Sequence, residues 1–177
     1  MAQGSRATAM FAGGCFWCIE HAFAKHEGVV STVPGYTGGE VSDPTYNQVA
    51  QGTTGHREAV FVTYDPTIVS YDELLDIFWR SIDPTDDGGQ FADRGSQYTT
   101  AVFYGTEEEK QKAEESKRRL EASHRFSDPI VTEILPAGRF WIAEDEHHDY
   151  ANKNPLQYRA YAISSGREVF CKRMWRA

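Results

Sequence analysis

Two cysteines separated by two residues are the part of this sequence best suited to covalent chemistry. Cys15 and Cys18 lie in the segment Gly-Gly-Cys-Phe-Trp-Cys, directly after an apolar run at residues 8–12 that predicts a buried strand. From Cys15 the apolar residues recur with a helical period until Gly28, so Cys15 falls in the first turn of a helix. The free amides and the dipole of a helix N-terminus stabilise an anion, so we expect Cys15 to be a stronger acid than a free thiol. The segment predicts a thiolate nucleophile with a second thiol one turn away.

The same cysteines have two other interpretations. Isolated cysteines are commonly small apolar residues on a buried helix face. A zinc site needs two further ligands, but Cys171 stands alone, and the adjacent His147 and His148 point about 100° apart on a helix. The glycines, the helix start and the pairing of the thiols favour redox chemistry over both interpretations, and we expect neither a metal nor a cofactor.

The elements that must position these thiols follow from hydrophobic periodicity and turn residues. Strands are expected at residues 8–12, 29–35, 57–64, 99–104 and 129–135, and helices at residues 15–28, 70–82 and 106–123. A helical turn at 46–50, a loop at 83–96 and a short helix at 144–152 complete the pattern, and the rest of the tail is expected to be irregular. Pro34 restricts its strand to a sheet edge or a strand end. This mixture predicts one α+β domain over residues 1–177, with helices on a mainly antiparallel sheet.

Composition excludes several classes of function. The chain has 177 residues and a formal net charge of −8, which disfavours binding to nucleic acid or to an anionic membrane surface. No apolar run approaches the about 18 residues that cross a bilayer, and the N-terminal segment does not resemble a secretory signal. Three cysteines cannot all pair within the chain, so we expect free thiols and a cytoplasmic location.

Five segments together resemble peptide methionine sulfoxide reductases of the A type, in the subgroup with a GCFWC motif. They are GCFWC at 14–18, GYTGG at 35–39, GHREAV at 55–60, FADRGSQY at 91–98 and EDEHHDY at 144–150. The resemblance covers residues 8 to 162, nearly the whole chain. It implies an α+β two-layer sandwich of the ferredoxin-like kind, with a long irregular C-terminal segment that begins here at about residue 136.

The resemblance also implies an activity, which is the reduction of methionine-S-sulfoxide, free or in proteins, as protein repair under oxidative stress. Cys15 attacks the sulfoxide sulfur, methionine leaves, and Cys15 remains as a sulfenic acid. A second thiol condenses with it to a disulfide, which thioredoxin opens by exchange. We assign the second thiol to Cys18; Cys171 is the alternative, although its tail segment does not match the glycine-rich tail of relatives that carry recycling cysteines there.

The remaining site residues are assigned by the same resemblance. Glu58 is expected to deliver the proton; burial of its strand face with Val60 and Val62 would raise its pKa, whereas a solvated strand end would leave it ionised. The expected hydrogen-bond donors to the sulfoxide oxygen are Tyr36 and Tyr98. Residues expected to pack against the S-methyl group or to lie near the site are Phe16, Trp17, Asp93 and His147.

Two rival functions remain open at this point. A general thiol–disulfide oxidoreductase would use Cys15 and Cys18 on protein disulfides, although the Phe-Trp pair between them disfavours that use. A binding module for oxidised methionine would release no product and would tolerate the substitution Cys15→Ser.

Overall fold

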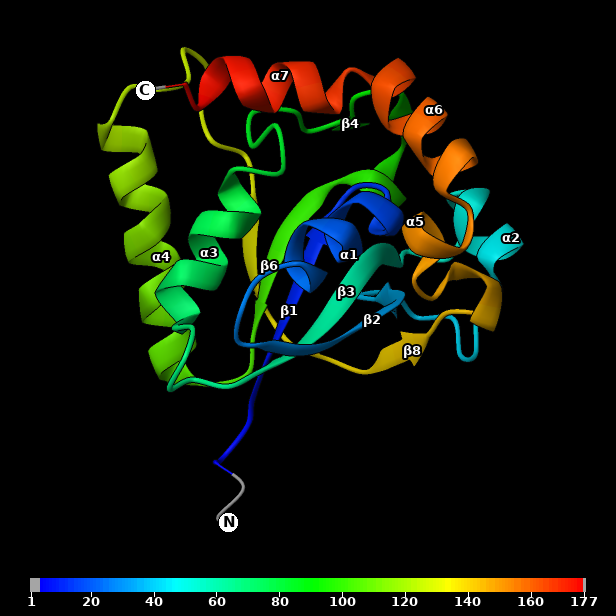
Figure 1. Cartoon of the computed structure of the whole chain (residues 1–177), viewed down its shortest axis with the longest axis horizontal. Coiled ribbons are helices and arrows are strands. Elements are labelled where there is room, and N and C mark those ends of the chain that lie inside the picture. Colours follow the sequence, from blue (N-terminus) through cyan, green and yellow to red (C-terminus); the bar gives the residue numbers. More distant parts are fainter. Residues whose placement is uncertain (1–3, 177) are drawn as a thin grey trace.

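Six strands form a mainly antiparallel sheet through the middle of the computed structural model, which describes residues 4–176 (Figure 1). The strand order is β7-β6-β1-β3-β2-β8. The bounds are β1 Ala7–Gly13, β2 Val29–Thr37, β3 Arg57–Tyr64, β6 Thr100–Tyr104, β7 Glu133–Pro136 and β8 Phe140–Ile142. Neighbouring strands are antiparallel except β6 and β7, which are parallel. A separate two-stranded hairpin contains β4 Gly89–Gln90 and β5 Asp93–Arg94.

Helices cover one face of this sheet and continue along one end of it (Figure 1). The helices are α1 Phe16–Ala24, α2 Tyr46–Ala50, α3 Tyr71–Trp79, α4 Glu107–Ala122, α5 Tyr150–Lys153, α6 Pro155–Ser165 and α7 Arg167–Met174, with 3-10 turns at Ser96–Tyr98 and Asp145–His147. Apolar side chains of α1, α3 and α4 share one buried cluster with the inward face of β1, β3 and β6. The sequence-based assignment of a mixed α+β chain with a mainly antiparallel sheet is confirmed.

The period-two pattern of β3 separates the two faces of the sheet as predicted. Val60 and Val62 belong to the main core, while Ala59 belongs to a smaller cluster on the opposite face. Glu58 has the same strand parity as Val60 and is also buried. The buried side of β3 thus carries a carboxyl group as well as a hydrophobic row.

The predicted start of the second long helix is confirmed by its hydrogen bonds. Ser70 Oγ accepts from the Glu73 amide at 3.1 Å, and Glu73 Oε2 accepts from the Ser70 amide at 2.7 Å. The expectation that Pro34 places its strand at a sheet edge is wrong for β2 as a whole, because β8 lies beyond it. The ladder between β2 and β8 nevertheless covers only residues 35–37. Residues of β2 before Gly35 lack a ladder on that side, where a proline without an amide proton is tolerated.

The expectation of an irregular tail from about residue 136 is wrong. The short helix predicted at 144–152 is present as the 3-10 turn Asp145–His147 and α5, but the region also contains β8, α6 and α7 (Figure 1). The helices escape a search for apolar stripes because α6 buries no residue and α7 buries only Arg167. Local signals were nevertheless present: Pro155 occupies the first turn of α6, and Gly166 ends it with a φ of 86°.

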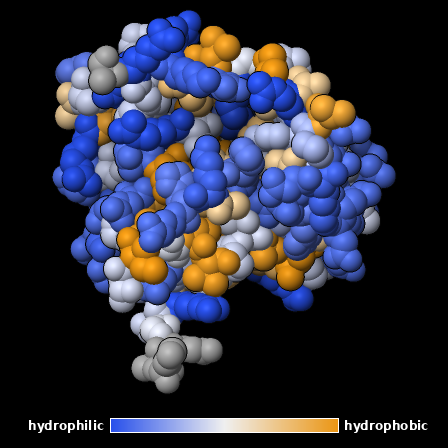
Figure 2. Space-filling view, viewed as in Figure 1, coloured by the Kyte–Doolittle hydropathy of each residue, from blue (hydrophilic) through white to orange (hydrophobic). Residues whose placement is uncertain are grey.

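The face seen in Figure 2 is mostly hydrophilic, with hydrophobic side chains in small separate groups. Within residues 4–176, the helices are too short or too polar to span a lipid bilayer.

The contact between β2 and β8 gives a test of the sheet edge. A Cβ added at Gly35 would lie 2.3 Å from the Trp141 carbonyl oxygen, so Gly35→Ala must push β8 away from β2. We expect a loss of about 3 kcal/mol in the free energy of unfolding, measured by urea denaturation. The matched control is Gly138→Ala, where no atom lies within 4 Å of the new Cβ. Equal stability of the two variants would contradict the observed register.

Candidate active site

Cys15 lies where β1 ends and α1 begins. It is the N-cap residue of α1, and its carbonyl accepts the first helical hydrogen bond from the Cys18 amide at 3.1 Å. Gly14, with a φ of 85°, makes the turn, and a Cβ there would collide with Gln90 at 2.6 Å. The Cys15 and Cys18 residues are only 6% and 5% exposed. The predicted strand–turn–helix junction is confirmed, and it encloses both thiols.

The two thiols share a hydrogen bond, which determines where a negative charge resides. Burial raises the pKa of the Cys15 thiol well above its ordinary value, and the contact with Cys18 adds to that rise. The hydrogen bond from Cys15 lowers the pKa of Cys18 to about 7. Burial therefore opposes the acidification of Cys15 that we expected from the helix N-terminus. A proton lost from the pair leaves its charge mainly on Cys18.

Glu58 is buried beside the thiols, with 2% of its surface exposed. Its Oε1 accepts a hydrogen bond of 3.1 Å from the Phe16 amide, one of the free donors at the start of α1. Burial raises the pKa of Glu58 to about 8, although the bond from Phe16 opposes that rise. The solvated alternative is excluded, and at neutral pH the side chain is a protonated acid that can donate through Oε2.

Aromatic rings surround the first turn of α1. Phe16 is 1% exposed, and Trp17 is half-buried with its ring stacked on Tyr150 at a centroid separation of 3.9 Å. Trp17 Nε1 donates to His147 Nδ1 at 3.1 Å, so the neutral His147 ring carries its proton on Nε2. His148 instead bonds the Ala143 carbonyl. The structure therefore settles which histidine faces the rings: it is His147.

Three tyrosines differ in how their hydroxyl groups are used. Tyr36 is fully buried and donates its hydroxyl proton to Glu144 Oε1 at 2.8 Å. Tyr46 and Tyr98 are partly buried, and their pKa values are raised by burial and by the proximity of Glu58 and other acidic groups of the site. The phenols of Tyr46 and Tyr98 thus stay protonated next to Glu58, whereas the Tyr36 proton is committed elsewhere.

Helix α6 covers the thiols with two further phenols. Tyr158 hydrogen-bonds Cys18, and Tyr161 donates to Asp93 Oδ2. The Tyr161 ring also meets Trp17 edge-on at 5.9 Å. Asp93, predicted from its motif, is therefore held at the site by a residue that the sequence analysis missed. The spacing of Tyr158 and Tyr161, three residues apart after Asn-Pro, was a usable signal of one helix face.

Glu144, to which the sequence analysis gave no role, and Cys171, its alternative to Cys18, both lie near these residues. Glu144 also accepts from the Tyr46 amide at 3.0 Å, which fixes α2 against the site. Cys171 lies half-buried on α7, and burial raises its pKa to about 11. It shares with Cys18 a cavity of about 580 Å³ between α1, α6 and α7. Cys171 thus lines the same cavity as Cys18, with a pKa raised by burial.

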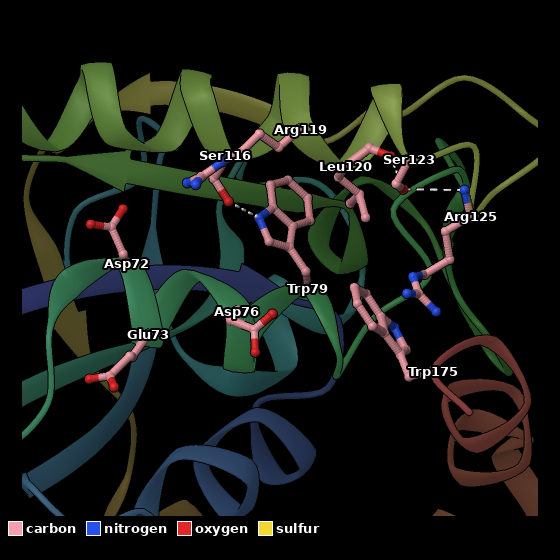
Figure 3. A pocket seen from close by; sticks show the side chains of 10 residues that line it. All are labelled: Asp72, Glu73, Asp76, Trp79, Ser116, Arg119, Leu120, Ser123, Arg125 and Trp175. Carbon is pink, nitrogen blue, oxygen red and sulfur yellow. Dashed lines mark hydrogen bonds between the residues drawn. The ribbon is translucent and has the colours of Figure 1, made fainter. Parts of the chain in front are cut away.

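A second cavity, shown in Figure 3, lies apart from this chemistry. It has a volume of about 450 Å³ between α3 and α4, and Trp79 and Trp175 form part of its wall. Trp79 Nε1 donates to Ser116 Oγ at 2.7 Å across it. None of its lining residues is a cysteine or histidine, so it contains no thiol.

Comparison with known proteins assigns the chain to a family. Residues 7–177 match the family described as peptide methionine sulfoxide reductase. The chain belongs to this family. Peptide methionine sulfoxide reductase MsrA of Bacillus licheniformis is 51% identical over 170 residues, which cover 96% of this chain and 94% of the relative. The activity of the family, thiol-dependent reduction of methionine sulfoxide, is accordingly that of this chain.

Solved structures of relatives share the fold. Methionine sulfoxide reductase A of Corynebacterium diphtheriae is 37% identical, with a TM-score of 0.79 over 88% of this chain and 78% of the other. Reduced Mxr1 of Saccharomyces cerevisiae is 31% identical, with a TM-score of 0.80 over 85% of this chain and 87% of the other. Mxr1 has also been solved in complex with Trx2.

The buried acid gives a prediction about stability and pH. The ordinary pKa of this side chain is 4.5, and burial raises the pKa of Glu58 to about 8 in the folded chain. Between these two pH values the folded chain keeps a proton on Glu58 that the unfolded chain has released. The free energy of unfolding therefore falls as pH rises through this range. This fall approaches about 1.4 kcal/mol per pH unit. We expect Glu58→Gln to remove it, measured by urea denaturation from pH 5 to 8. The control Glu121→Gln, on the exposed face of α4, should keep the wild-type slope.

Proposed function

We propose that this chain reduces the S epimer of methionine sulfoxide, free or in oxidised proteins, and that thioredoxin restores it through a Cys15–Cys18 disulfide. The observation that carries the proposal is the pair of interacting thiols at the start of α1, with the buried carboxyl group of Glu58 bonded to the next residue, Phe16, and close enough to act on the pKa of Cys15. A sulfoxide needs a sulfur nucleophile and a proton source together, and this arrangement supplies both.

The first step forms a sulfenic acid. Cys15, as thiolate, attacks the sulfoxide sulfur, and Glu58 protonates the oxygen as negative charge develops on it. The attack joins Cys15 sulfur to the substrate sulfur, and the protonated oxygen then moves from the substrate sulfur to Cys15 sulfur. The S–O bond and the new S–S bond of the substrate both break, and methionine leaves with the electron pair of the S–S bond. In sum, one thiol and one sulfoxide give one sulfenic acid and one thioether.

Cys18 assists this step before it becomes a reactant. Because the anion of the reduced pair resides mainly on Cys18, transfer of the Cys15 proton along their shared hydrogen bond generates the nucleophile. When substrate is bound, its reaction with the Cys15 thiolate removes that thiolate. The proton transfer from Cys15 to Cys18 is therefore drawn forward.

Substrate recognition uses the phenols and rings of the same region. Tyr46 and Tyr98 donate to the sulfoxide oxygen, supported by their protonated state beside Glu58. Tyr36 has a positioning role, because its bond to Glu144 fixes the carboxylate that holds the Tyr46 amide. Phe16 and Trp17 bind the S-methyl group through their ring faces.

Recycling completes the cycle. The Cys18 sulfur attacks the sulfur of the Cys15 sulfenic acid, the S–O bond breaks as the disulfide forms, and the thiol proton of Cys18 leaves with the hydroxyl group as water. A dithiol then attacks the disulfide, and two exchanges return both thiols while the reductant becomes a disulfide. The solved pairing of the related Mxr1 with Trx2 supports thioredoxin as that dithiol.

The cysteine roles predict distinct single-turnover results. Reduced wild-type protein given one equivalent of methionine-S-sulfoxide without reductant should release about one methionine and lose two thiols. Cys15→Ser should release none. Cys18→Ser should still release about one methionine but stall with thioredoxin, whereas Cys171→Ser should turn over as wild type. Thioredoxin-dependent turnover in Cys18→Ser would move the resolving role elsewhere.

The same assay separates the rival functions. A general thiol–disulfide oxidoreductase would reduce insulin disulfides while leaving the sulfoxide intact. A binding module would retain the sulfoxide, release no methionine and be indifferent to Cys15→Ser. Either pattern would contradict the proposed cycle.

The two buried-site tyrosines should respond differently to loss of a hydroxyl group. Tyr46→Phe should slow methionine release about tenfold to hundredfold, because a donor to the developing oxyanion is lost, with little change in stability. Tyr36→Phe should cost about 1 to 2 kcal/mol in the free energy of unfolding, since Glu144 loses a buried donor, and should slow release less. Quenched-flow measurement of methionine and urea denaturation give the two quantities. The reverse ranking of the two rates would restore Tyr36 as the donor.

We further propose that the fold is a two-layer sandwich of the ferredoxin-like kind, acting as one catalytic domain over residues 1–177. The strand order β6-β1-β3-β2, with α1 following β1 and α3 following β3, supports this class. The need for a reducing partner and the three free thiols of the structure support a cytoplasmic location.

A further inference from the structure

Arg167, the first residue of α7, is buried without an acidic partner. It is 7% exposed, and its Nη1 donates to the carbonyls of Gly13 at 3.0 Å and Ser81 at 2.8 Å. Its Nε and Nη2 atoms have no hydrogen-bond partner among residues 4–176, and no carboxylate oxygen of that range lies within 4.0 Å of the guanidinium. Because a buried charge is costly unless it is compensated, this cation requires an anion nearby.

The backbone directs this cation toward the thiols. Gly13 directly precedes the Gly14–Cys15 turn, and the Arg167 Nη2 atom lies 2.8 Å from the position of a Cβ at Gly14. Any side chain at position 14 would displace the guanidinium. Gly166, with a φ of 86°, ends α6 and lets the chain change direction into α7. This change of direction places Arg167 next to the Gly14–Cys15 turn.

The remaining neighbours do not supply the missing anion. The ring of Phe91 lies 4.8 Å from the guanidinium carbon and offers only a neutral aromatic face. The cavity that Arg167 lines with Cys18 also contains Lys25, Arg80 and Lys172. Its one acidic side chain, Glu168, is bound to Lys172.

We propose that Arg167 is the counter-ion of the thiolate formed by the Cys15–Cys18 pair, and hence a positioning residue of the catalytic cycle. The inference rests on the proposed function only for the use of that thiolate; the ion pair itself is a property of the reduced chain. Arg167 lowers the pKa of Cys15 and of Cys18 by its charge, against the burial that opposes both ionisations.

The other titratable groups that face the dithiol are acids that raise the pKa of a thiol, opposite to Arg167, or neutral phenols. From β3, Glu58 raises the pKa of Cys15, and from β5, Asp93 raises that of Cys18. From α6, Tyr158 bonds Cys18 and favours its anion, and Tyr161 lies close enough to Cys15 for its own pKa to be raised. Arg167 is the one cation acting on both thiols among the groups that shift them.

The role extends to recycling. When a thiolate of the reductant attacks the Cys18 sulfur, the disulfide bond breaks and its electron pair leaves on Cys15 as a thiolate. When Cys15 is attacked instead, the charge leaves on Cys18. In both cases Arg167 stabilises the departing anion, so it lowers the barrier of exchange as well as that of sulfoxide attack.

The test measures the thiolate directly, without turnover. The pH dependence of iodoacetamide alkylation is recorded from pH 5 to 10 for the reduced chain in a Cys171→Ser background, and for Arg167→Met, Arg167→Lys and Arg80→Met in the same background. We expect Arg167→Met to raise the apparent pKa of the reactive thiol from about 7 to about 8 and to slow alkylation at pH 7 roughly fivefold. Arg167→Lys should stay within about twofold of the parent. Arg80→Met removes a cation that lines the same cavity but is paired with Asp76. Its alkylation profile should match that of the parent.

The outcomes separate this inference from the proposed function. An unchanged alkylation profile in folded Arg167→Met overturns the counter-ion role. If Arg167→Met does not unfold cooperatively on heating, the pKa of the reactive thiol in the parent protein is used instead. A parent pKa at or above the about 8.5 of a free cysteine overturns the counter-ion role. A parent pKa near 7, together with the expected Arg167→Lys profile, supports it. Methionine release is assayed in parallel. An Arg167-dependent pKa without release supports the ion pair and contradicts the proposed function.

Discussion

The hydrogen bond from the Phe16 amide to Glu58 is the interaction on which the site depends. It joins the first turn of α1 to the strand β3 inside the core, at a place that water does not reach. A helix start has free amides that need acceptors, and a buried carboxyl group needs donors, so each satisfies the other. Because one oxygen is used for that purpose, the other remains to carry the proton. The acid that the chemistry needs is therefore a consequence of how the nucleophile's helix is anchored.

Charge in the site is confined to a small part of it. Burial keeps Glu58 and the phenols of Tyr46 and Tyr98 protonated, so they act as donors and add no negative charge at neutral pH. The dithiol can then hold one anion opposite a cation from the distant end of the chain. Because the donors are neutral and the negative charge is confined to the dithiol, one pocket can contain several proton donors and a nucleophile. The donors and the nucleophile then do not neutralise one another.

The sequence was sufficient where local rules and burial agree. The junction at Cys15 could be predicted because a strand, two glycines and a helical period follow one another. Alternation along β3 put Glu58 on the same face as Val60 and Val62, but it did not decide whether the end of that face is buried. The acidity of Cys15 could not, because desolvation depends on what the tail places over the thiol. The distinction between Tyr36 and Tyr46 likewise depends on Glu144, which follows β8 and approaches β2 only through the sheet register. The tail itself was missed because its helices bind through single phenols and one arginine, without an apolar stripe.

Helix α6 buries no residue, although it lies over both thiols. Its attachment to the site includes the side chains of Tyr158 and Tyr161, which bond Cys18 and Asp93. Neither phenol belongs to the buried hydrophobic clusters that hold the sheet and its helices together. The exposure of the two sulfur atoms is therefore governed by a segment outside the core, so a substitution that loosens α6 alters it while the sheet stays intact.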